Sequence, residues 1–282
     1  MRIVMLIENT AVSQKLLVEH GMSLFVENKG GYTLFGTGSS SKLINNAKRM
    51  KLPMDRVKQA VIPHNHFSYT GGIDSLTASN PDVKIYALRA AGCKPVHKKG
   101  FFSEPMGDLQ EKIKKHRESF VLFKAFQQID QGFFLLKDEI KDKSFYITDK
   151  NAKIKRGESF VNDEMEHECF GAVFPGRRKT DGCVILGGCA HCGISNMVKT
   201  VRRNWGDIPI LSVISGFHFM GDSAKKMTVD SEFIQRTAEE IKKLDIGVIY
   251  TCHCTGLKGY EELKSHLGNQ LQYLQTGEEL NF

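Results

Sequence analysis

The last hundred residues of this 282-residue chain alternate between apolar, strand-like runs and amphipathic helical segments. Strands are expected at 183–188, 208–214 and 246–250, and helices at 194–205, 231–244 and 260–267. This alternation is typical of parallel strands joined by helices that cover the sheet. Hydrophobic residues make up 41% of the chain and charged residues 25%, which excludes disordered and fibrous classes.

The first third of the chain also favours strands followed by helices. Strands are expected at 2–8, 22–27, 32–35, 57–62 and 83–88, helices at 42–50 and 71–78, and a hairpin turn at Lys29-Gly30-Gly31. Short strands are expected near 133–136 and 144–147, and a stronger strand at 169–174. A closing hairpin of 271–274 with 279–282 is expected across Gln275-Thr276-Gly277. Two strand-rich stretches, each followed by helices, predict a layered α/β sandwich.

Five histidines follow predicted strands directly. They are His64, His66, His191, His218 and His253. The carboxyl ends of parallel strands meet at one edge of a sheet and form a common crevice. A single histidine at such a place is usually a hydrogen-bonded structural residue, but five at equivalent places predict a metal site.

The stretch His64-Asn65-His66 is the clearest part of this pattern. In extended backbone, alternate residues point the same way, so both imidazoles can reach one ion. With His191 they would supply three neutral ligands and leave a tetrahedral zinc ion one open position, as in catalytic sites. Such an ion lowers the pKa of bound water to about 7 and polarises an oxygen.

Four of the seven cysteines flank two of these histidines. Cys189 and Cys192 surround His191, whereas Cys252 and Cys254 surround His253. A zinc site built on cysteine is an alternative, but alternate residues of a strand end should face away from the histidine, so buried core thiols are expected. Because the number of cysteines is odd and no export signal is visible, reduced thiols in the cytoplasm are expected rather than disulfides.

The net charge of +7 is concentrated in one segment. Residues 89–128 hold nine Lys and Arg against four Asp and Glu, and are expected to form a basic, partly helical insertion. It could attract a small anionic substrate or be a solvated face. Nucleic acid is not an expected partner, no run approaches the ~18 apolar residues of a membrane helix, and nothing indicates an oligomeric state.

The motifs together resemble the metallo-β-lactamase superfamily, and within it the dihydropterin-methyl-ribofuranosylaminobenzene-phosphate synthase subgroup. The resemblance covers nearly the whole chain and implies one domain, 1–282, with an αββα four-layer sandwich. The stretches that carry it are Glu19-His20-Gly21-Met22-Ser23, Leu34-Phe35-Gly36-Thr37-Gly38, Asn45-Asn46-Ala47, Thr70-Gly71-Gly72, Glu166-His167-Glu168, Gly188-Cys189-Ala190-His191-Cys192-Gly193-Ile194, Ser215-Gly216-Phe217-His218-Phe219 and Cys252-His253-Cys254-Thr255-Gly256.

The chain departs from the superfamily at its metal ligands. The superfamily motif is His-x-His-x-Asp-His, but Ser68 replaces its Asp and Tyr69 its last His. Gly36 replaces an Asp that supports the metal loop. The first family metal keeps its ligands, His64, His66 and His191, whereas the second keeps only His253. The resemblance therefore implies one divalent ion, zinc with iron or manganese as alternatives, and no second one.

Loss of the Asp also removes the family's proton acceptor. His253 is the expected replacement as general acid or base, with His218 as a second catalytic candidate. His167, Ser68 and Tyr69 are expected to bind substrate. The expected function is a metal-dependent hydrolase or transferase acting on a small phosphorylated or pterin-like anion. The alternative is a catalytically degenerate homologue that binds ligand or metal without turnover.

Overall fold

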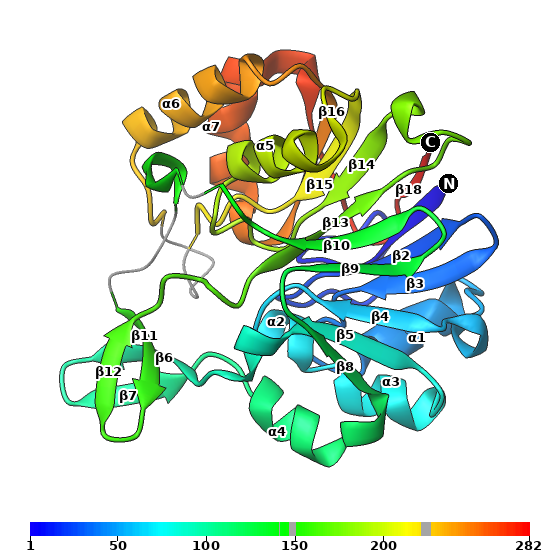
Figure 1. Cartoon of the computed structure of the whole chain (residues 1–282), viewed down its shortest axis with the longest axis vertical. Helices are drawn as coiled ribbons and strands as arrows, with labels where there is room; N and C mark the ends of the chain where they lie inside the picture. Colours follow the sequence, from blue (N-terminus) through cyan, green and yellow to red (C-terminus); the bar gives the residue numbers. More distant parts are fainter. Residues whose placement is uncertain (141, 147–150, 221–226) are drawn as a thin grey trace. The chain divides into compact units, whose positions relative to one another are not determined.

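The computed structural model describes residues 1–140, 142–146, 151–220 and 227–282 (Figure 1). The chain forms two compact units. Unit 1 comprises 1–127, 148–169 and 275–282, and unit 2 comprises 128–147 and 170–274. Each unit is built on its own seven-stranded sheet.

The sheet of unit 1 has the strand order β18-β1-β2-β3-β4-β5-β8. Its strands are β1 Arg2–Ile7, β2 Ser23–Asn28, β3 Gly31–Phe35, β4 Gln59–Ile62, β5 Lys84–Leu88, β8 Phe120–Phe123 and β18 Glu279–Asn281. The first three are antiparallel neighbours, whereas β3, β4, β5 and β8 run parallel. The predicted turn between β2 and β3 is confirmed, with positive φ at Lys29 and Gly30.

Short helices connect the strands of unit 1. They are α1 Lys42–Arg49, α2 Phe67–Thr70, α3 Ile73–Ser79 and α4 Leu109–Lys115, with 3-10 turns at Met54–Arg56, Arg89–Gly92 and Arg117–Ser119. Every strand predicted within the first ninety residues is present, and its ends differ by at most two residues. The β4 strand is buried from Ala60 to Ile62 and leads directly into His64.

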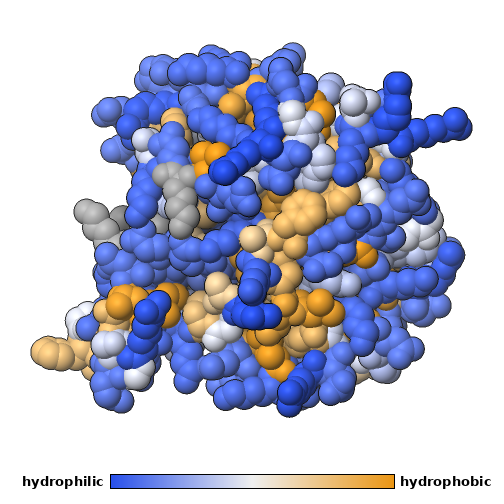
Figure 2. Space-filling view, in the orientation of Figure 1, coloured by the Kyte–Doolittle hydropathy of each residue, from blue (hydrophilic) through white to orange (hydrophobic). Residues whose placement is uncertain are grey.

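Segment 89–128 does not form one helical block. Its β6 Pro95–Lys99 and β7 Phe102–Pro105 join β11 Ala152–Arg156 and β12 Ser159–Asn162 in a third, four-stranded sheet. Only α4 and two 3-10 turns are helical, and β8 belongs to the main sheet. The face seen in Figure 2 is mostly hydrophilic, but Phe101 and Phe102 are exposed at the β6–β7 turn.

The second sheet has the order β17-β16-β15-β14-β13-β10-β9. Its strands are β9 Phe126–Asp130, β10 Phe133–Lys137, β13 Cys169–Val173, β14 Cys183–Leu186, β15 Ile210–Ser215, β16 Ile246–Thr251 and β17 Leu271–Tyr273. The four from β14 to β17 are parallel. Helices α5 Ile194–Trp205, α6 Ser231–Lys242 and α7 Gly256–Leu267 pack on them, with 3-10 turns at Lys143–Phe145, Lys179–Asp181, His253–Thr255 and Gly268–Gln270 (Figure 1).

Two local predictions are wrong. The expected closing hairpin is absent: β17 pairs with β16 in the second sheet, whereas β18 pairs with β1 in the first. Residues 275–277 therefore lead from one sheet to another instead of reversing the chain. The segment expected to form a strand at 144–147 contains the 3-10 turn Lys143–Phe145 instead. Residue 147 lies outside the described residues.

Asn46 on α1 holds the segment that follows β1. The side chain is fully buried and donates through Nδ2 to the carbonyls of Leu6 and Leu17, at 2.9 and 2.8 Å. Its Oδ1 accepts from Leu17 N at 2.8 Å. One amide thus pairs three backbone groups that have little access to water.

Asn46→Ala should lower the free energy of unfolding by about 1–3 kcal/mol, because buried backbone groups lose their partners. Asn45→Ala is the matched control, since Asn45 is exposed on the same helix; its effect should stay within about 0.5 kcal/mol. Urea unfolding followed by circular dichroism measures both, and equal effects would contradict the role of Asn46.

Candidate metal centre

His64 and His66 lie together in the loop that follows β4. Both are buried, and their ring centroids are 4.6 Å apart in an edge-to-face arrangement. The backbone between them is not extended as predicted, because His66 N donates to His64 O at 3.0 Å in an i to i+2 turn. The two imidazoles still converge, so unit 1 supplies two neighbouring nitrogen ligands.

Asn65 fixes this turn from inside unit 1. Its Nδ2 donates to the carbonyls of Ala91 and Cys93 at 3.0 and 2.9 Å, and its Oδ1 accepts from Leu109 N at 3.0 Å. A Cβ at Gly107 would lie 2.2 Å from Asn65 Oδ1, so glycine is needed there. Asn65, which stands between the two histidines in the sequence, therefore points its amide into the protein.

His167 holds the same turn with both nitrogens of its ring. Its Nδ1 accepts from Asn65 N at 3.2 Å, which requires that this nitrogen carry no proton. Its Nε2 therefore carries the proton and donates to Asp163 Oδ2 at 3.0 Å. Both ring nitrogens are thus engaged, and His167 is placed to position the His64–His66 turn.

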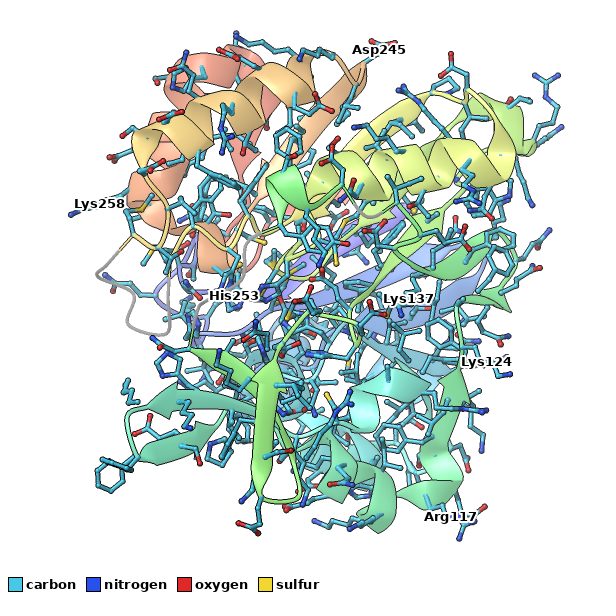
Figure 3. The ribbon with its side chains drawn as sticks, turned by 60° about the vertical axis from the view of Figure 1, so that its left-hand side comes forward. Arg117, Lys124, Lys137, Asp245, His253 and Lys258 are labelled. Atoms are coloured by element: carbon cyan, nitrogen blue, oxygen red, sulfur yellow. The ribbon has the colours of Figure 1, made fainter. Side chains whose placement is uncertain are left out.

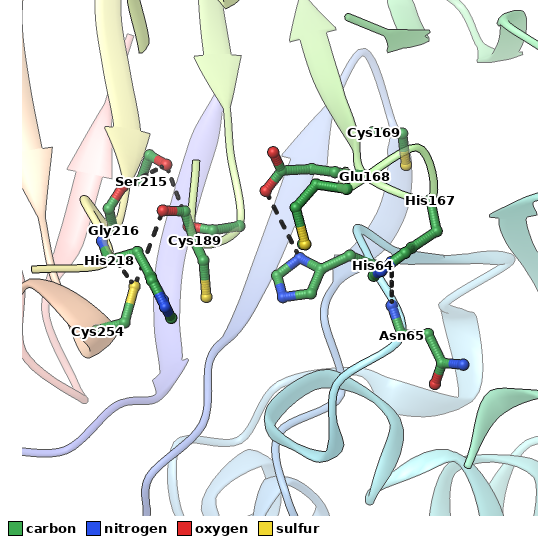
Figure 4. A network of polar contacts seen from close by, with 12 residues as sticks. His64, Asn65, His167, Glu168, Cys169, Cys189, Ser215, Gly216, His218 and Cys254 are labelled. Carbon is green, nitrogen blue, oxygen red and sulfur yellow. Dashed lines mark hydrogen bonds and ion pairs between the residues drawn. The ribbon is translucent and has the colours of Figure 1, made fainter. Parts of the chain in front are cut away.

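Two buried carboxylates complete this arrangement. Glu168 Oε1 lies 3.8 Å from His64 Nδ1 (Figure 4), and its negative charge favours a proton on that nitrogen, which leaves Nε2 for a metal ion. Burial alone raises the pKa of Asp163, but hydrogen bonds from His167 and Met165 N outweigh it and lower the pKa to about 2. Asp163 therefore stays ionised at neutral pH.

Two of the three replaced motif positions, Gly36 and Tyr69, are neighbours in unit 1. Tyr69 is fully buried, and its ring centroid is 4.6 Å from that of His64. Gly36 has a φ of +77°, and a Cβ there would lie 2.4 Å from Met22 O and 3.0 Å from Tyr69 Cδ1. A carboxylate side chain therefore does not fit at position 36, chiefly because of the Met22 backbone. Ser68 is partly buried on α2.

In unit 2, three histidines follow three neighbouring parallel strands. His191 follows β14, His218 follows β15 and His253 follows β16. The ring centroids of His191 and His218 are 4.0 Å apart. His253 is buried, and Figure 3 shows it inside the molecule, whereas Lys258 on α7 points outward.

These loops hold non-glycine residues with left-handed backbone. Ala190, His218 and His253 have φ values of 52°, 47° and 52°. Such values are uncommon outside glycine and occur often at functional sites. The loop geometry also brings together Cys189 Sγ, Cys254 Sγ and a ring nitrogen of His218, all within 4.8 Å of one another.

None of the seven cysteines, which all lie within the described ranges, forms a disulfide. Cys189 is buried, and burial together with the neighbouring Cys254 raises its pKa well above the usual value, although His191 opposes this. His218 N donates to Cys254 Sγ at 3.2 Å. The thiols beside the histidines therefore take part in the polar network of these loops.

The chain is similar to known proteins over nearly its whole length. It is 27% identical over 283 residues to the 7,8-dihydropterin-6-methyl-4-(beta-D-ribofuranosyl)-aminobenzene-5'-phosphate synthase of Methanocaldococcus jannaschii, covering 94% of this chain and 90% of that protein. No family model matches. Tm1679, described as a metal-dependent hydrolase of the beta-lactamase superfamily, superposes with a TM-score of 0.81 at 22% identity, over 100% of this chain and 99% of that one. The chain has the metallo-β-lactamase fold.

A further solved structure agrees with this fold. The metallo-beta-lactamase fold protein YhfI from Bacillus subtilis superposes with a TM-score of 0.59 at 11% identity, covering 99% of this chain and 98% of that one. The predicted αββα fold class is confirmed, and so is the resemblance to the synthase subgroup.

The donor set of this metallo-β-lactamase fold suits a divalent metal ion. Unit 1 offers the imidazoles of His64 and His66, and unit 2 offers those of His191, His218 and His253 together with thiols. Imidazole and thiolate are the ligands that zinc prefers. No sequence pattern predicts a role for Asn65, Asp163 or Glu168, except that Asp163 and His167 stand four residues apart.

Several cations of segment 89–128 have partners within unit 1. Lys112 and Lys115 lie 2.9 and 3.1 Å from Asp74 Oδ2, and His116 lies 2.6 Å from its other oxygen. Lys98 lies over the ring of Phe160 at 4.5 Å. Arg117 and Lys124 point outward in Figure 3. Part of the local charge excess therefore stabilises the fold.

The pair of Asp163 and His167 predicts a pH dependence. Since the pKa of Asp163 falls from 3.8 to about 2 on folding, its contribution is complete above pH ~4 and is lost as the pH falls towards ~2. It amounts to about 2 kcal/mol. Asp163→Asn should remove this part of the pH dependence of unfolding.

The control for this measurement is Asp82→Asn, which changes an exposed carboxylate. Urea unfolding between pH 5 and pH 3 gives the free energy of unfolding as a function of pH, and this curve should have the same slope for the control and the unaltered chain. The same slope for Asp163→Asn as well would show that the carboxylate of Asp163 is not stabilised by His167.

Proposed function

We propose that the protein is a metal-dependent hydrolase or transferase that uses one divalent ion at a superfamily-type site. The supporting observation is the buried pair of imidazoles from His64 and His66, which Asn65 and His167 hold in place. His191 is the third ligand by resemblance to the superfamily. Zinc is the expected metal, with iron and manganese as alternatives.

The bound ion would supply Lewis-acid polarisation of a substrate oxygen. Beside it, the carboxylate of Glu168 lies 3.8 Å from His64 Nδ1 and favours the tautomer in which Nε2 is the ligand nitrogen. His167 keeps the His64–His66 turn in one conformation through its two hydrogen bonds. The protein thus supplies prearranged ligands rather than ligands that must be ordered on binding.

Proton transfer is assigned to His253, which is buried at the end of β16, because imidazole is the side chain that most often transfers protons near neutral pH. His218 is the second candidate. The proposed substrate is a small anion, phosphorylated or pterin-like, as the name of the synthase relative suggests. Ser68 and Tyr69 offer hydroxyl groups to it; His167 could offer only the face of its ring, since both its nitrogens are engaged.

A cytoplasmic location belongs to the same proposal. Among the described residues, no helix combines the length and the apolar character needed to cross a bilayer. The seven free thiols are typical of a reducing compartment.

A second candidate function is binding without turnover. It is supported by the replacements at Gly36, Ser68 and Tyr69 and by the lack of room for a carboxylate at position 36, where a Cβ would lie 2.4 Å from the backbone oxygen of Met22. A protein with this site would retain the imidazole pair and lack the acidic group that the superfamily uses as proton acceptor.

Metal content tests the first proposal. Protein purified without chelator or added metal should lose one equivalent per chain in the double variant His64→Ala, His66→Ala, and hydrolysis of a chromogenic phosphodiester should fall by at least about 100-fold. His266→Ala on α7 is the control and should change neither quantity. Unchanged metal content in the double variant would refute the proposed ligands, whereas metal binding without hydrolysis would favour the second candidate.

Restoring the superfamily motif separates the two candidates further. Ser68→Asp combined with Tyr69→His should add one metal equivalent, because a carboxylate and an imidazole replace two neutral hydroxyls. If phosphodiester hydrolysis appears only then, the unaltered chain binds without turnover. If the content of metal stays the same, the proposed match of Ser68 and Tyr69 to the motif is wrong.

A further inference from the structure

Unit 2 contains a second group of possible metal ligands. Cys189 Sγ, Cys254 Sγ and a ring nitrogen of His218 all lie within 4.8 Å of one another (Figure 4). Cys189 and Cys254 are about 2% exposed, and His218 is partly buried. Distances of this size between donor atoms suit ligands that can share one ion.

The fold of unit 2 forms this group from three adjacent strands. Cys189 follows β14, His218 follows β15 and Cys254 follows β16, and these strands are parallel neighbours. Gly188 O accepts from Ser215 Oγ at 3.1 Å and from Gly216 N at 2.8 Å, which joins the first two loops. The three ligands are therefore held by the rigid ends of one sheet.

Gly216 leaves space for one of the sulfur atoms. A Cβ at position 216 would lie 2.5 Å from Cys254 Sγ, a distance that real contacts do not reach. The φ of Gly216 is not in the left-handed region, so its backbone would accept other residues. The requirement for glycine there is thus steric, and it serves the position of the Cys254 thiol.

The backbone N–H of His218 points at the sulfur of Cys254. His218 N donates to Cys254 Sγ at 3.2 Å, and the Cys254 thiol donates to Cys189 O at 3.9 Å, a proton that a bound metal ion would replace. N–H groups directed at a ligand sulfur orient it and stabilise its negative charge. Two thiolates and one imidazole form a soft ligand set, which selects zinc and related thiophilic ions over magnesium or calcium.

We propose that Cys189, His218 and Cys254 bind a thiophilic divalent cation of the zinc class. This ion is additional to the one assigned to His64, His66 and His191, and it does not depend on Ser68 or Tyr69, since all three ligands belong to unit 2. Three protein ligands leave one coordination position for water or a substrate group. In this site His218 is a ligand rather than a proton carrier.

Cobalt(II) reports thiolate ligands independently of activity. The full-length chain, stripped with chelator and kept reduced, should develop thiolate-to-cobalt charge-transfer bands in the near ultraviolet when titrated with cobalt(II). The same titration of the His64→Ala, His66→Ala variant should give the same bands, because that variant removes only the first set of ligands. The proposed function and this site can therefore fail separately.

Single substitutions identify the ligands. Cys189→Ser and Cys254→Ser should each remove about half of the charge-transfer intensity and weaken cobalt binding at least about tenfold, and His218→Ala should weaken binding similarly. Cys183→Ser is the matched control, since Cys183 is a buried thiol at the opposite end of β14, and it should leave the bands unchanged.

Far-ultraviolet circular dichroism of each variant confirms that it is folded. If a serine variant does not fold, the cobalt(II) titration of the unaltered chain still tests the proposed site, because an absence of thiolate bands in that titration overturns the proposal. Bands that persist in folded Cys189→Ser and Cys254→Ser would also overturn it, since another thiol would then be the ligand.

Discussion

A single neutral imidazole determines the geometry of the proposed first metal site. His167 accepts from the backbone N–H of Asn65 and donates to Asp163, so it can hold only one tautomer. The turn that it fixes presents His64 and His66 as neighbours, and the same segment carries Glu168 to His64. Backbone hydrogen bonding of Cys169 N to Pro63 O joins this segment to the end of β4.

The replaced motif residues form one consistent set. The ring of Tyr69 lies against His64 and against the position where residue 36 would carry a side chain. The positive φ and the backbone oxygen of Met22 require glycine at position 36, and Tyr69 packs beside it. In unit 2, a softer set of ligands includes none of these three positions.

The sequence predicted the strands and helices well, because their apolar periodicity is local. It failed where an outcome depended on partners distant in the chain. Residues 271–282 carry a hairpin signal, but β18 pairs with β1 and β17 with β16. The network of Asn65 and Asp163 joins residues about a hundred positions apart, and no local pattern reveals it.

The cysteines show a different limit. The expectation that thiols face away from the neighbouring histidines assumed extended backbone, in which side chains alternate. Ala190 and His253 have left-handed φ values, so the alternation ends at these loops. Cys189 and Cys254 consequently meet His218. The histidine pattern itself was readable, because strand ends place all five residues at edges of sheets.

His167 should position the pair of metal ligands without being a ligand itself. A crystal structure of the zinc-loaded protein, with anomalous data collected on both sides of the zinc edge, would show this. We expect an anomalous peak about 2.0–2.1 Å from one ring nitrogen each of His64 and His66, with His167 still bonded to Asn65 and Asp163. A zinc ion bound to His167, or no peak at His64 and His66, would contradict the account.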